Sequence, residues 1–162
     1  SPLFAAQIST ASVPPVVAQL SSSVSQLPAN TTPNAITYDS QDLLMGITHT
    51  INGSRVTVPL SGVYIIVLGG QISRTGGGGV QSEDIWIRKN GVDIPHSGIR
   101  QTLLNPNDTA VVVNNFALNL VAADYIEVMQ QVSISTVGLG ITRLDVSGGP
   151  SIPSIIFTML KM

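Results

Sequence analysis

The sequence contains no cysteine and few charged residues. Among its 162 residues, 7 are Lys or Arg and 9 are Asp or Glu, which gives a formal net charge of −2. Without cysteine the chain cannot form disulfides or thiolate metal sites, so burial and hydrogen bonds must stabilise the fold. The basic residues are scattered, whereas nucleic-acid binding requires clustered Lys and Arg. We therefore expect no nucleic-acid partner.

A hydrophobic segment long enough to cross a membrane is also missing. The longest apolar run covers residues 63–68, and a membrane-spanning helix needs about 20 apolar residues. We therefore expect no membrane insertion. What the sequence does contain is 43% hydrophobic residues, which suffices for the core of one domain of this length.

Short apolar runs separated by Gly, Asn, Asp and Pro fill most of the chain, as in β-sandwiches and barrels. Asn-Gly pairs at 52–53 and 90–91 predict tight turns, because both residue types tolerate positive φ. Alternating apolar and polar residues in 84–89, 111–120 and 124–134 predict half-buried strands. The patterns together predict an all-β, antiparallel two-sheet sandwich.

Two segments depart from this alternation, because residues 63–68 and 155–160 are apolar, or nearly so, on both faces. One face of a sandwich strand meets the core and the other usually meets water, so a doubly apolar strand needs a second cover. A neighbouring subunit is the simplest cover. A loop or the N-terminal arm of the same chain is the alternative.

The first 34 residues are rich in Ser, Ala, Pro and Thr and carry no charged side chain. We predict an N-terminal arm or linker over 1–34, with residues 3–8 as a candidate first strand, and one domain over 35–162. A heptad-like spacing within the arm leaves a short helical stalk as the alternative to extended structure. That spacing is formed by Val13, Val17, Leu20, Val24 and Leu27.

Residue patterns that would indicate an enzyme or a metal site are weak. The glycines at 76–79 lead into a predicted strand instead of the Lys-Ser/Thr and helix of a phosphate-binding loop. His49 and His96 lack the second histidine or the carboxylate cluster that zinc requires. No Gly-x-Ser-x-Gly elbow is present, and the carboxylates are dispersed. We therefore predict a non-enzymatic protein without cofactor or metal.

Several motifs resemble a known family. The segment 56–67, with Gly62 and Tyr64, is similar to the Gly-x-Tyr strand of the globular heads of the first complement component and of tumour necrosis factor. The segment 85–91 resembles that family's strand ending in Lys-Asn-Gly, and the order of motifs is most like the versions in phage and large-virus structural proteins. Aliphatic residues replace two aromatics of the pattern, and Ala123 replaces a glycine. The family's calcium-binding loops have no matching acidic cluster here.

The resemblance implies a trimeric jelly roll whose inner sheet packs around a three-fold axis. In the family, the Gly-x-Tyr strand and the last strand belong to that sheet, and here they correspond to the two doubly apolar segments. We therefore predict a set of subunit-interface residues. They are Val63, Tyr64, Ile66, Tyr125, Ile155, Phe157 and Met159.

The function expected from these features is that of a virion structural protein. It would be a homotrimeric module on the particle surface, such as a fibre head, spike or capsid decoration, contacting other virion proteins and a host receptor or glycan. One alternative is a purely architectural shell protein whose arm threads into neighbours. Another is a carbohydrate-binding or carbohydrate-cleaving module in which Trp86, Tyr125 or Tyr38 stacks on sugars, although an aromatic on an alternating strand more often covers a sheet face.

Overall fold

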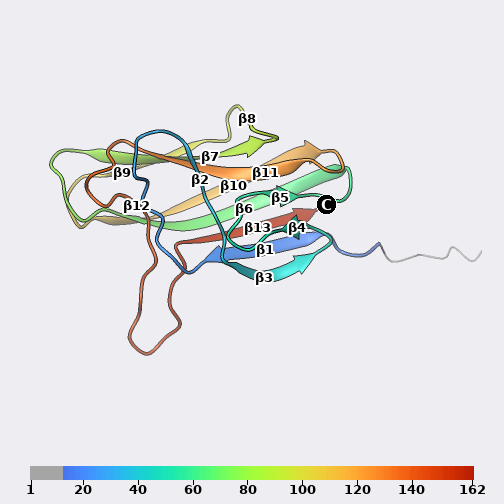
Figure 1. The fold of residues 1–162 in the computed structure, drawn as a ribbon, viewed down its shortest axis with the longest axis horizontal. Coiled ribbons are helices and arrows are strands. Elements are labelled where there is room, and N and C mark those ends of the chain that lie inside the picture. The colour runs from blue at the N-terminus through green and yellow to red at the C-terminus, as the bar shows by residue number, and fades with distance from the viewer. Residues whose placement is uncertain (1–12) are drawn as a thin grey trace, which may run out of the picture.

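The computed structural model describes residues 13–162, which form two antiparallel β-sheets packed face to face (Figure 1). This part of the chain contains strands and no helix, and therefore no helix that could span a bilayer. The predicted all-β antiparallel sandwich is confirmed. The strands are β1 (Val17–Ser22), β2 (Asn34–Ala35), β3 (Ser40–Met45), β4 (Thr48–His49), β5 (Val56–Thr57), β6 (Gly62–Ser73), β7 (Gln81–Lys89), β8 (Val92–Asp93), β9 (Ile99–Leu103), β10 (Thr109–Leu120), β11 (Tyr125–Val132), β12 (Gly140–Ile141) and β13 (Ile155–Lys161).

We call the two layers sheet A and sheet B. Sheet A has the strand order β10-β6-β13-β1-β3, and β12 pairs with the end of β6. Sheet B has the order β4-β5-β11-β7-β8, with β2 added to β11 and β9 added to β7. Many neighbours in each sheet come from distant parts of the chain, so most strand pairings are non-local.

The core lies between the inner faces of the two sheets. Alternate residues of each strand point inward, and the largest fully buried apolar side chains include Tyr38, Tyr64 and Phe157. The rings of Tyr38 and Phe157 lie 5.4 Å apart between centroids. Full burial of a side chain such as Phe157 contributes about 1.5–3 kcal/mol to the free energy of folding.

The N-terminal segment belongs to the sandwich from residue 17 onward. β1 lies between β13 and β3 and pairs with both of them, and its Ala18 and Leu20 are fully buried. Residue 34 is therefore not the boundary of a separate arm in the described part of the chain, because the burial of β1 makes it part of the core. Of the heptad-like positions, Val13 precedes β1, Val17 and Leu20 lie on it, and Val24 and Leu27 lie in the following connection. The predicted strand at 3–8 lies outside the described residues.

The Asn90-Gly91 pair forms the tight hairpin between β7 and β8, as predicted. Both residues have positive φ, 50° and 80°, and Lys89 pairs directly with Val92 across the turn. The Asn90 side chain also accepts a hydrogen bond from the Tyr125 backbone N–H at 2.9 Å. The side chain of Asn90 thus connects the β7–β8 turn to the start of β11.

The Asn52-Gly53 pair differs from the prediction of a two-residue hairpin. Asn52 has a φ of 66°, but the pair lies in the longer connection between β4 and β5. The Gly53 carbonyl accepts hydrogen bonds from the Tyr38 backbone N–H at 3.2 Å and from the His49 ring at 3.0 Å. These hydrogen bonds stabilise the longer connection instead of a two-residue turn.

Candidate functional site

Five of the seven predicted interface residues lie inside the sandwich. Their exposed fractions are 1% or less, so a partner subunit cannot contact their side chains. They are Tyr64, Ile66, Ile155, Phe157 and Met159. They are buried because even-numbered residues of β6 and odd-numbered residues of β13 face the core. Most of the predicted residues on these two strands have those numbers.

The remaining two residues lie on opposite sheets. Val63 is exposed on the outer face of sheet A. Tyr125 lies on β11 of sheet B, with the Arg55 guanidinium carbon 4.3 Å above the centre of its ring. Val63 and Tyr125 therefore lie on the outer faces of different sheets, and their place at a subunit interface stays a prediction.

Several exposed apolar side chains lie together on the outer face of sheet A, among them Val67, Val113 and Ile156. We define this face by the outward-pointing residues of its strands. They are Val17, Gln19 and Ser21 of β1; Leu43 and Met45 of β3; Val63, Ile65, Val67, Gly69 and Gln71 of β6; Val111, Val113, Asn115, Ala117 and Asn119 of β10; and Ile156, Thr158 and Leu160 of β13.

The strand register places these residues in rows across the sheet. One row runs from Ala117 through Ile65, Leu160 and Val17 to Met45. Every member of this row is apolar, and it crosses all five strands. The outer face of sheet A therefore carries an unbroken apolar row beside rows that mix apolar and uncharged polar residues. An apolar row of this length is unusual for the solvent side of a lone sandwich.

A shallow hollow interrupts this face over β6. It has a volume of about 200 Å³ and lies where Gly69 and Gly70 offer no side chain, between Val111, Ile156 and Pro153. A Cβ added at Gly69 would meet no other atom within 4 Å. The hollow could accept an apolar side chain from another molecule.

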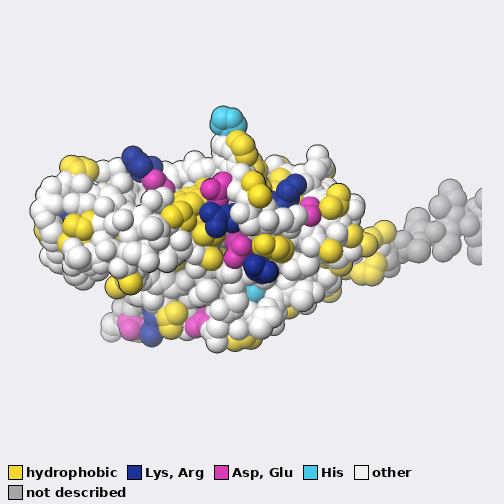
Figure 2. Space-filling model, turned by 45° about the horizontal axis from the view of Figure 1, so that its top comes forward, with side chains coloured by type: hydrophobic (Ala, Val, Ile, Leu, Met, Phe, Trp, Pro, Cys, Tyr) yellow, Lys and Arg dark blue, Asp and Glu magenta, His cyan; other side chains and the backbone are white. Residues whose placement is uncertain are grey.

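The central strands of sheet A and the strands of sheet B differ in outward-pointing charge; the exposed Asp42 lies on the edge strand β3. Among the outward-pointing residues of β1, β6, β10 and β13, all of which the structure describes, none is charged. The outer face of sheet B instead carries Asp84, Arg88, Arg100 and Glu127 on β7, β9 and β11. Figure 2, which brings the β7 and β8 side forward, shows acidic and basic side chains close together among hydrophobic ones.

The residues considered for sugar stacking have different surroundings. Tyr38 is completely buried, so it cannot contact a ligand. The same burial raises the pKa of its hydroxyl. Tyr125 is covered on one side by Arg55. Trp86 is partly exposed and lines a groove on the outer face of sheet B. Trp86 is therefore the aromatic residue best placed for contact with a ligand.

The histidines do not form a metal site in the described structure. His49 is buried, and both ring nitrogens have protein partners, the Gln41 side-chain amide at 3.2 Å and the Gly53 carbonyl at 3.0 Å. His96 lies exposed in a turn with a φ of 63°. Within residues 13–162, no three His, Asp or Glu side chains gather into a group that could hold a metal ion.

Two buried charged residues were not predicted from the sequence. Arg74 is 1% exposed, and its guanidinium donates to the carbonyls of Asn105 and Gly79. Glu83 is equally buried on the inner face of β7, and neither carboxyl oxygen has a hydrogen-bond partner. Extending the alternation of Ile85 and Ile87 back by one step would have placed Glu83 inside.

A scan of the sequence against models of known protein families finds no match, and a search of curated proteins finds no similar sequence.

Proposed function

We propose that the chain is a non-enzymatic structural module that assembles into a homotrimer through the outer face of sheet A. The observation that carries the proposal is that this face has an apolar row across all five strands and no outward-pointing charge on β1, β6, β10 or β13, while the opposite face is charged. Apolar faces of this extent are typical of surfaces that meet another molecule. A second copy is a suitable partner, because neither copy would leave a charge buried at the contact.

The strand order supports a jelly-roll assignment. In that fold, eight strands form two four-stranded sheets through Greek-key connections. The sequences β10-β6-β13-β1 and β5-β11-β7-β9 within the two sheets correspond to such an arrangement. Together with the family resemblance, this order is the reason for preferring three copies around an axis.

The same resemblance motivates the proposed location on a virus particle, as a fibre head, spike or capsid decoration in contact with other virion proteins. Labelling of particles with an antibody against the chain tests that location. Antibody bound at the particle surface is expected, and its absence from particles that contain the protein would contradict a surface role.

Sedimentation velocity at micromolar concentration tests the assembly. We expect a species with three times the mass of the chain. Raising the NaCl concentration to about 1 M should leave it intact, because an uncharged interface has no ion pairs for salt to screen. A single-chain mass at every concentration would refute the proposal, and dissociation by salt would indicate a charged interface elsewhere on the molecule.

A further inference from the structure

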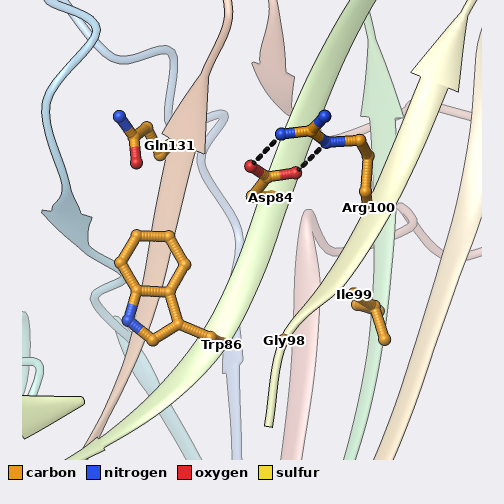
Figure 3. Close-up of a pocket in the computed structure, with 6 residues that line it drawn as sticks. All are labelled: Asp84, Trp86, Gly98, Ile99, Arg100 and Gln131. Carbon is orange, nitrogen blue, oxygen red and sulfur yellow. Dashed lines mark hydrogen bonds and ion pairs between the residues drawn. The ribbon is translucent and has the colours of Figure 1, made fainter. Parts of the chain in front are cut away.

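The outer face of sheet B contains a groove that the proposed assembly does not use. Its volume is about 420 Å³, within the range of about 300–1,000 Å³ typical of small-molecule sites. Figure 3 shows Asp84 and Trp86 projecting from β7, with Gln131 to one side and Arg100 to the other. The lining is completed by Gly98 and Ile99.

The register of three strands gives the groove two parallel rows. Arg100, Asp84 and Gln131 are direct partners across β9, β7 and β11, and they form a polar row. The next outward row contains Trp86, whose partner on β11 is the buried Met129. An aromatic surface therefore lies directly beside a line of planar hydrogen-bonding groups.

The polar row is held in place before any ligand binds. The Arg100 guanidinium donates two hydrogen bonds to the Asp84 carboxylate, from Nε at 2.6 Å and from Nη2 at 2.8 Å. Gln131 donates its amide N–H to the Thr31 carbonyl at 2.7 Å, which leaves its side-chain oxygen free to accept. Paired side chains of this kind lose little conformational entropy on binding.

Trp86 is also fixed in orientation. Its Nε1–H donates to Asp93 at 2.8 Å, and the same carboxylate oxygen accepts from Arg88 at 2.8 Å. The indole N–H is thus already used, and the ring offers a face rather than a donor. Gly98 lies opposite, where an added Cβ would be 3.5 Å from the Trp86 Cβ. The missing side chain leaves this side of the groove open.

We propose that this groove binds a neutral hexopyranose unit of a glycan. The C–H face of a pyranose ring is apolar and stacks on an aromatic ring, while its hydroxyl groups both donate and accept hydrogen bonds. The groove matches that pattern with Trp86 on one row and carboxylate, guanidinium and amide groups on the other. Asp84 and Arg100 neutralise each other, so the site favours an uncharged sugar over an anionic one.

The groove and the proposed assembly face belong to opposite sheets. Assembly through sheet A would leave sheet B facing outward, and three linked grooves would raise the avidity for a multivalent glycan surface. The inference itself does not depend on trimerisation, because all the lining residues come from one chain.

The chain has one tryptophan, so its fluorescence reports directly on the groove. We expect titration with neutral oligosaccharides, namely maltotriose, lactose and mannotriose, to change Trp86 emission in a saturable way for at least one of them. A glycan array that contains neutral and sialylated structures provides the independent measurement. Absence of binding in both assays would overturn the inference, as would binding restricted to sialylated glycans.

Two variants locate the binding. Gly98→Leu fills the groove while keeping the reporter, and Trp86→Ala removes the stacking surface and is measured on the array. We expect each to weaken binding by about tenfold or more. Gly78→Leu is the matched control, since an added Cβ there meets no atom within 4 Å, and it should bind as the unmodified protein does. Binding that survives both groove variants would place the site elsewhere and overturn the inference.

Discussion

Val67→Asp and Ile156→Asp should each convert the trimer into single chains without unfolding them. In one chain these side chains are 40% and 42% exposed, so a carboxylate there remains hydrated, and surface substitutions usually change stability by about 0.5 kcal/mol or less. At the interface between two copies the same carboxylate would be desolvated, which would reduce the free energy of association by several kcal/mol. Mass measurement by light scattering, with thermal unfolding in parallel, should record monomers of nearly unchanged stability.

Val92→Asp is the matched control for these variants. Val92 is 69% exposed on β8 at the edge of sheet B, so the same change adds a charge away from the outer face of sheet A. This variant should remain trimeric. Trimers in the Val67→Asp and Ile156→Asp variants, or monomers in the control alone, would contradict the assignment of the interface.

Stability should fall as the pH rises from about 5 to about 8, and Glu83 should be the cause. Burial raises the pKa of Glu83 from its ordinary value of 4.5 to about 8, and the adjacent negative charge of Asp84 adds to the rise. The folded chain therefore holds a proton that the unfolded chain releases above pH 4.5. The contribution of protonated Glu83 to the free energy of unfolding is fully present below pH 4.5. It is lost progressively as the pH rises to about 8. Over this window the loss from Glu83 is about 4 kcal/mol.

Glu83→Gln should remove most of this pH dependence, because the amide stays neutral at every pH. The variant should gain stability relative to the unmodified chain at pH 8 and much less at pH 5, as measured by urea unfolding at each pH. Glu127→Gln makes the same chemical change on the outer face of β11, where Ser54 donates to the carboxylate, and should retain the slope. Equal slopes in all three proteins would refute the role of Glu83.

The strand faces could be predicted where polar residues mark the alternation. In β7, Ile85 and Ile87 are buried and Trp86 points outward, as the sequence indicates. In 63–68 every residue is apolar, so the sequence contains no information on which parity faces the core. Thr158 marks the outward parity of β13 and could have identified Ile156 as an outer residue. Without that single polar residue, the sequence does not distinguish the inner from the outer face of 155–160.

The groove could not be assembled from the sequence, for a different reason. Asp84, Arg100 and Gln131 lie far apart in the chain, and their meeting depends on the pairing of β7 with both β9 and β11. Such non-local pairing is set by the packing of the whole sandwich instead of by local residue patterns. Trp86 was the one groove residue that its type and position singled out.

Thiol labelling tests the central claim most directly, because the natural chain has no cysteine. In Val67→Cys the single thiol should react with a maleimide at least about tenfold more slowly than in Val92→Cys while the protein is trimeric, since burial blocks access. The protection should disappear on dilution to single chains. Equal reactivity of the two thiols in the native protein, or protection of Val67→Cys that persists in single chains, would contradict assembly through the outer face of sheet A.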